Sequence, residues 1–247
     1  MVSYYKTVAN RLIEIDSIIN GCWVSVVDPT AQERKMLIEE YGLDSDFLKS
    51  SLDEEESSRV EQEEKQTLII VDTAVSEVQK DDTLIFYTMP LGIIITEHHV
   101  FTISLRENKV IDDVVNGRVR NIQTQFRTQF VLRLVMNITS SFLIYLNQID
   151  KTSSVMQRKL HGAMKNHELI QMLELEKSLI YFSTSLKSND VTMNKILRGR
   201  VVKLYEEDQD LLEDVLIELK QAQEMASIYS SILSGVVDAF ALSFPTI

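Results

Sequence analysis

The acidic side chains between residues 206 and 218 are the strongest candidates for chemistry in this 247-residue chain. The stretch has a helical pattern, so Asp214 and Glu218 share a face one turn apart, and Glu207 and Asp210 extend that face upstream. Like charges at this spacing repel, and a hard cation such as Mg²⁺ or Ca²⁺, which prefers oxygen ligands, would relieve the repulsion. A solvated polar face is the alternative explanation. The full set of carboxylates is Glu206, Glu207, Asp208, Asp210, Glu213, Asp214 and Glu218.

The histidines and the single cysteine are expected to be structural or solvated. His98 and His99 are neighbours at a strand end and should point to opposite faces, and His161 and His167 lack the i,i+4 spacing of a shared metal site. Cys22 lies in an apolar strand and is expected to be a buried thiol. The sequence has no glycine-rich phosphate loop and no Gly-x-Ser-x-Gly elbow, so an enzyme is the least favoured class.

Bulk properties narrow the possible partners. The net charge of −12 argues against a nucleic-acid surface, and one cysteine permits no intrachain disulfide, which suits a reducing compartment. Residues 1–11 lack the apolar core of a signal peptide, and residues 226–247 read better as a buried stalk than as a membrane span. The sequence therefore predicts no transmembrane segment within this chain.

A long apolar stripe from residue 201 onward predicts a helix over residues 200–243, about 65 Å long. A helix of this length extends beyond its own domain, so other helices, an oligomer or an absent segment must cover the stripe. Its positions are Leu204, Asp208, Leu211, Val215, Leu219, Ala222, Ala226, Tyr229, Leu233, Val236 and Phe240.

The earlier residues predict an α/β fold, with a mixed sheet flanked by helices, a long helical hairpin and a very long C-terminal stalk helix. The expected domains are a head at 1–117, a hairpin at 118–190 and a stalk at 194–247. The hairpin is predicted to break near 150–154, and 187–194 to form a polar loop. Strands are expected at 22–27, 68–73, 84–88, 92–96 and 100–105, with Pro90 separating two of them, and helices at 31–41, from 44 or 45, and at 108–115.

Five segments in this order resemble the cytoplasmic part of the CorA family of divalent-cation transporters. They are Phe-Leu at 47–48, the acidic segment 52–61, Pro-Leu-Gly-Ile-Ile-Ile-Thr at 90–96, Val-Phe-Thr-Ile at 100–103, and Ser-Gly-Val-Val-Asp-Ala-Phe at 234–240. Each motif alone is modest, whereas the ordered set is fairly specific.

The resemblance implies a homopentamer whose stalk helix continues into the first of two membrane spans. Both spans and the family's Gly-Met-Asn signature are absent from this sequence, and Pro245 disfavours a helix at Phe244, so we expect a truncated or altered soluble portion on the cytoplasmic side of a membrane. The resemblance also implies that Mg²⁺ bound between neighbouring cytoplasmic domains holds the pore shut.

Matched to the family, Asp214 falls on an acid of such a regulatory cation site and Glu218 on a second contributor. The match fails elsewhere, because Lys49 and Ser50 replace an acidic pair, and Met136 or Asn137 replaces a further acid. The site is therefore weakened, lost or moved to Asp53 and Glu54, which are weaker metal candidates.

Two functions remain open. The leading hypothesis is the cytoplasmic regulatory and gating domain of a magnesium (or cobalt/nickel) transporter, which senses divalent cations through acidic sites between subunits. The alternative is a non-transporting acidic scaffold that binds a partner through its long helix.

Overall fold

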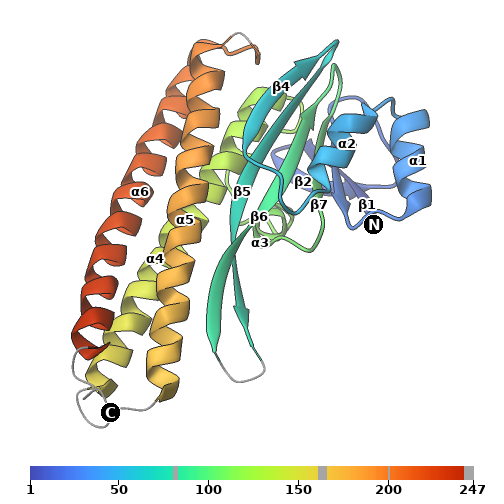
Figure 1. Cartoon of the computed structure of the whole chain (residues 1–247). Helices are drawn as coiled ribbons and strands as arrows, with labels where there is room; N and C mark the ends of the chain where they lie inside the picture. Colours follow the sequence, from blue (N-terminus) through green and yellow to red (C-terminus); the bar gives the residue numbers. More distant parts are fainter. Residues whose placement is uncertain (80–82, 161–165, 200, 242–247) are drawn as a thin grey trace.

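The molecule has three layers, with a helical bundle on one face of a central sheet and two short helices on the other (Figure 1). The structure, a computed structural model, describes residues 1–79, 83–160, 166–199 and 201–241. The helices are α1 (Ala31–Glu39), α2 (Ser45–Ser51), α3 (Lys109–Val115), α4 (Arg127–Leu160), α5 (Asn166–Arg198) and α6 (Glu206–Ala241).

The seven-stranded sheet has the order β2-β1-β3-β7-β6-β5-β4, and only β3 and β7 run parallel. This mixed sheet with its long C-terminal helices confirms the predicted fold class. The strands are β1 (Val2–Val8), β2 (Arg11–Ile15), β3 (Trp23–Val27), β4 (Arg59–Glu63), β5 (Gln66–Val78), β6 (Leu84–Ile95) and β7 (Val100–Ser104).

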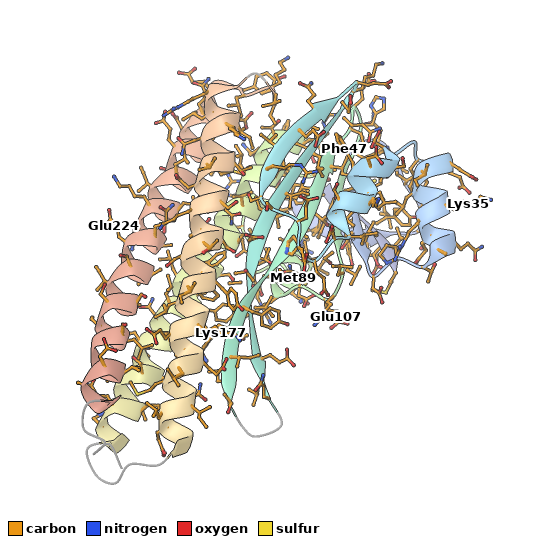
Figure 2. All side chains as sticks on the ribbon, in the orientation of Figure 1. Lys35, Phe47, Met89, Glu107, Lys177 and Glu224 are labelled. Carbon is orange, nitrogen blue, oxygen red and sulfur yellow. The ribbon has the colours of Figure 1, made fainter. Side chains whose placement is uncertain are left out.

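Each face of the sheet has its own apolar core, because alternate residues of a strand point to opposite sides. Trp23 and Ile93 belong to the large core beneath α3, α4, α5 and α6, whereas Val24 and Ile94 belong to the smaller core beneath α1 and α2. Figure 2 shows Phe47 of α2 between its helix and the sheet, where its side chain is buried.

Local signals set the ends of the short helices. Thr30 and Glu33 form a reciprocal capping box at the start of α1, with Thr30 N to Glu33 Oε2 at 2.8 Å. Asp44 caps α2 by accepting from two backbone N–H groups. Gly42 and Gly117 follow α1 and α3 with positive φ angles, a conformation that glycine adopts without a Cβ penalty.

The boundaries predicted for the long helices were wrong at three places. Helix α6 begins at Glu206, and residues 201–205, which were predicted to be helical, precede it without helical structure. Helix α4 runs through residues 150–154, where Ser153 Oγ donates to the Asp150 carbonyl and so satisfies its hydroxyl within the helix. Helix α5 runs through the predicted loop at 187–194, because polar residues there bind the sheet. The C-terminal residues around Pro245 lie outside the described residues.

Strand β6 is also continuous, although Pro90 was predicted to divide it. Pro90 lies opposite Asp72 of β5, and β7 pairs with β6 only from Gly92 onward. The Pro90 nitrogen therefore faces no neighbouring strand that needs an N–H donor, a position that proline tolerates. Strands β1, β2 and β4 were not predicted at all.

Polar side chains of α5 fix the bundle to the β5–β6 ribbon. Gln171 forms two hydrogen bonds with the Leu84 backbone (2.8 and 3.0 Å), Ser178 accepts from Phe86 N (3.2 Å), and Ser185 donates to Thr88 Oγ1 (2.9 Å). Further along the helix, Asn189 binds the backbone of β5. The ribbon extends beyond its pairing with β4 and β7, so Gln171, Ser178 and Asn189 satisfy backbone groups that no strand reaches.

The C-terminal helix α6 packs along α4 and α5, and this bundle covers the apolar stripe. Val215, Leu219, Ala222 and Ala226 are completely buried, and Leu233 nearly so. Within the described residues, the 36-residue helix is about 54 Å long at 1.5 Å per residue. The expectation that the stripe needs other helices is met by α4 and α5 of the same chain.

Candidate divalent-cation site

Asp214 and Glu218 lie on one flank of α6, as the helical spacing predicts. Asp214 is exposed and Glu218 is half-buried. Tyr229 lies on the same flank about three turns beyond Glu218, and burial and then the charge of Asp150 of α4 raise its pKa, which indicates that this flank borders α4. Neither carboxylate forms an ion pair or a side-chain hydrogen bond within the described part of the chain. Both are therefore free to bind a cation from solution.

The neighbouring helix offers no third carboxylate, because the sequence of α4 contains no acid before Asp150. Met136, one of the two residues that the resemblance matches to a family acid, packs against the large core. The other, Asn137, places its amide 3.4 Å from the Val110 carbonyl. No group of three or more His, Cys, Asp or Glu side chains among the described residues has the geometry to hold a metal ion.

Another acid of the same cluster has a structural role. Asp208 is only 4% exposed, and its Oδ2 accepts a hydrogen bond from Tyr205 N at 3.0 Å, immediately before α6 begins. This bond satisfies one of the orphan N–H groups at the helix start. The sequence counted Asp208 both on the apolar stripe and among the acids, and the capping bond explains how a carboxylate can occupy that position.

The weaker candidates, Asp53 and Glu54, lie on the exposed loop between α2 and β4. Asp53 Oδ1 accepts from Glu55 N at 3.0 Å, and Glu54 forms an ion pair of 3.1 Å with Arg106. The nearby Ser50 accepts a hydrogen bond from Arg59 at 3.2 Å. Asp53 and Glu54 thus already have hydrogen-bond or ion-pair partners within the chain. No described contact joins this loop to Asp214 or Glu218.

Cys22 and His99 contact each other, which the sequence did not predict. Cys22 Sγ lies 3.5 Å from His99 Nδ1, and burial raises the pKa of the thiol, so it stays protonated. The His98 ring is exposed and meets the His99 ring edge-on at 6.2 Å. This supports a structural role for the pair. His161 and the His167 side chain lie outside the described part of the structure.

A cleft of about 650 Å³ lies between the starts of α4 and α6 and was not anticipated either. Phe126, Arg127 and Tyr205 line it together with Glu206 and Glu207. The aromatic rings of Phe126 and Tyr205 are mostly exposed, and the Lys203 ammonium lies 4.9 Å from the centre of the Tyr205 ring. Asp214 and Glu218 do not line the cleft, whereas Glu207, on the upstream part of the same helix face, does.

Within the described residues, one helix is long and apolar enough to span a membrane by length and composition alone. It is α4 over Arg127–Arg158, with a hydropathy of 1.4, and 56% of that window is buried inside the fold. A core helix passes the same test, and α4 is packed between the sheet and the other bundle helices.

Three solved structures are similar to this fold over almost the whole chain. The complete CorA magnesium transporter from Methanocaldococcus jannaschii matches 98% of this chain and 77% of its own, with a TM-score of 0.85 and 23% identity. The soluble domain of that CorA matches 96% of this chain and 95% of its own length, with a TM-score of 0.84 and 23% identity. The ZntB cytoplasmic domain from Vibrio parahaemolyticus matches 98% of this chain and 96% of its own length, with a TM-score of 0.74 and 8% identity.

The sequence comparison is more specific than the fold. The profile of the CorA-like Mg²⁺ transporter protein family matches residues 20–243, so the chain belongs to this family. The cobalt/magnesium transport protein CorA of Methanocaldococcus jannaschii is 27% identical over 220 residues, which cover 87% of this chain and 68% of that protein. The family is one of transporters rather than enzymes.

Proposed function

We propose that this chain is the cytoplasmic regulatory and gating domain of a CorA-like transporter of magnesium, or of cobalt or nickel. The observation that carries the proposal is the family match over residues 20–243, combined with two unpaired carboxylates one turn apart on α6. The scaffold alternative gains no such support. In this proposal α6 leads toward a membrane span, and the chain lies on the cytoplasmic side of the cell membrane.

Asp214 and Glu218 are the proposed regulatory cation ligands. Mg²⁺ demands six oxygen ligands but keeps several waters, and proteins often bind it through one or two carboxylates. A hydrated ion on these two side chains needs further ligands, which the described part of one chain does not supply. We therefore place the site between two subunits, where Asp53 and Glu54 of a neighbour are candidate contributors.

The outer surface of α6 supports self-association into the pentamer that the family resemblance implies. Ile217, Ile228 and Ile232 are 65%, 56% and 54% exposed, and their spacing places them along one face of the helix. Figure 2 shows Glu224 on this outer side of α6, pointing away from the sheet. An exposed row of isoleucines bordered by charged residues is typical of a surface that a protein partner covers.

Gating in this proposal follows from the thermodynamic linkage between cation binding and the closed arrangement of the subunits. A cation that binds only the closed arrangement stabilises it by the difference in affinity between the two states. Removing the cation leaves acidic surfaces that repel across the interface, since the chain carries a net charge of −12.

The first test is the mass of the chain by light scattering, with chelator and then with Mg²⁺. The proposal expects a Mg²⁺-dependent increase in mass and in thermal stability, and D214N/E218Q should lose both responses. The control is E63Q, which neutralises an exposed carboxylate on β4, outside the proposed cation site and the outer face of α6, and should respond as the unmodified chain does. A response to Na⁺ of matched ionic strength, or one that survives D214N/E218Q, contradicts the assigned site.

A further inference from the structure

The last turns of α4 present a basic surface that the cation site does not use. Lys151, Val155 and Arg158 are spaced by four and three residues, so they share one face of the helix. Both cations are exposed, and Val155 is 40% exposed between them. Arg158 Nε donates to the Ser154 carbonyl at 3.3 Å, and neither cation forms an ion pair with a described carboxylate.

The charge of this region differs from that of the rest of the chain. From residue 151 to residue 167 the sequence has four lysines and arginines and no aspartate or glutamate, although the net charge of the whole chain is −12. The nearest preceding acid, Asp150, is half-buried and lies close enough to Tyr229 of α6 to affect its hydroxyl. Asp150 therefore turns toward the bundle, and Lys151, Val155 and Arg158 form the outer face.

This surface lies at the same end of the bundle as the C-terminal part of α6. Helices α4 and α6 run in the same direction, and burial and then the charge of Asp150 raise the pKa of Tyr229, so these two residues lie at a similar height along the bundle. Beyond this level, Met156 of α4 and Val236 and Val237 of α6 pack against the same core. The basic face therefore lies at the end of the bundle toward which α6 leads.

We propose that the face formed by Lys151, Val155 and Arg158 contacts the anionic lipid headgroups of the membrane that carries the transporter. The inference rests on the proposed function, which places the membrane beyond the end of α6. Lysine and arginine attract the negative surface of a leaflet, and an exposed valine between them can lie against the headgroup layer. The contact would fix the height of the bundle above the membrane.

The experiment attaches the chain to vesicles by a C-terminal hexahistidine and a nickel-chelating lipid. A fluorophore is placed on Ser154→Cys, an exposed position beside the basic face, and Cys22 is completely buried, which favours selective labelling. Vesicles of phosphatidylcholine, with or without phosphatidylglycerol, carry a quencher on their headgroups. We expect stronger quenching on the anionic vesicles.

Charge reversal identifies the residues. Each Lys or Arg near an anionic surface contributes about fivefold, so K151E/R158E should lower the ratio of contacting to free molecules by at least about 25-fold. The control K195E/R198E makes the same change in net charge at the C-terminal end of α5, the opposite end of the bundle, and should leave the ratio unchanged. Circular dichroism of both variants checks that they fold.

Several results would overturn the proposal. They are equal quenching on neutral and anionic vesicles, an equal loss in the control, and a stronger effect of inorganic phosphate than of chloride at matched ionic strength. A change in mass on K151E/R158E without lipid would instead assign the face to a second copy. The Mg²⁺ response of D214N/E218Q is measured without vesicles, so failure of cation sensing and failure of lipid contact are separate results.

Discussion

Asn189 and Asp72 are joined by two hydrogen bonds, from Asp72 N to Asn189 Oδ1 and from Asn189 Nδ2 to the Asp72 carbonyl, each of 2.9 Å. The amide of Asn189 thus pairs with β5 as the backbone of a neighbouring strand would. Gln171 repeats this arrangement on Leu84 of β6. These two amides tie α5 to the ribbon, and α5 in turn packs against α6, which carries the candidate cation site.

Replacing Asn189 with alanine should lower the free energy of unfolding by about 1–3 kcal/mol, because an N–H and a C=O in a half-buried position lose their partners. Urea unfolding measures the change, and the amide of Asp72 should exchange with deuterium faster. The control is Asn194→Ala on the same helix, where the amide donates only to the Asp190 carbonyl of its own helix. Equal effects of the two substitutions would contradict the special role of Asn189.

Gly92 marks the closest approach of α2 to the sheet. A Cβ at Gly92 would lie 2.1 Å from Ser51 Oγ and 3.1 Å from Ser51 Cα, so Gly92→Ala forces the helix to move and should cost about 1–3 kcal/mol. Combining it with Ser51→Gly should recover part of that loss, since the obstructing side chain is gone. A double-mutant cycle by urea unfolding measures the coupling, and strict additivity would show that the two residues do not clash.

Gly235 provides the opposite case and a matched control. It lies within α6, and a Cβ there meets no atom within 4 Å. Gly235→Ala should therefore stabilise the chain by about 0.5–1 kcal/mol, because glycine loses more backbone entropy in a helix than alanine does. The two substitutions thus have the same chemistry and opposite expected signs.

The sequence predicted the elements whose signals are local. Helices were predicted at 31–41, from 44 or 45, and at 108–115, and the structure confirms all three, with caps at Thr30, Asp44 and Asn108. The sequence did not predict the loop-like polar residues as part of α5, because the partners of Asn189 and Thr192 are Asp72 and Ser58, far away in the sequence. Long-range hydrogen bonds override local propensity there.

The candidate site shows the same difference between local signals, which the sequence reveals, and long-range contacts, which it does not. Helical spacing places Asp214 and Glu218 on one flank of α6, and the structure has them there without an ion pair or side-chain hydrogen bond to any described residue. Spacing could not separate Asp208 from the other acids, because its role depends on the backbone of Tyr205. Nor could it relate Asp53 to the helix, because no described contact within one chain joins the two regions.

His99 should make stability depend on pH. Burial, followed by the charges of His98 and Arg127, lowers the pKa of His99 below its ordinary value, and Cys22 Sγ is 3.5 Å from its ring. Because the unfolded chain binds a proton at higher pH than the folded chain does, this contribution is fully present above about pH 6.5 and is lost as pH falls toward the folded pKa. Stability should therefore rise with pH across this window.

The measurement is urea unfolding of the chain and of His99→Gln over a series of pH values from about 5 to 8. The slope should weaken in His99→Gln. His98→Gln removes an exposed imidazole and should retain most of the slope, with a small change because His98 contributes to the shift. An unchanged slope in His99→Gln would assign the pH dependence to other groups.

The acids of α6 should separate into a structural group and a cation-binding group. Asp208→Ala removes the hydrogen bond to Tyr205 N and should lower the free energy of unfolding by about 1 kcal/mol, the typical cost of losing a cap. Asp214→Ala changes an exposed side chain without partners and should stay within about 0.5 kcal/mol in chelator. The response to Mg²⁺ should separate the two variants in the opposite way. The unmodified chain and Asp208→Ala should gain thermal stability when Mg²⁺ is added, whereas Asp214→Ala should not. If Asp208→Ala also loses the Mg²⁺ response while remaining folded, the cation binds at the start of α6, beside the cleft that Asp208 lines, and Asp214 is a solvated surface residue.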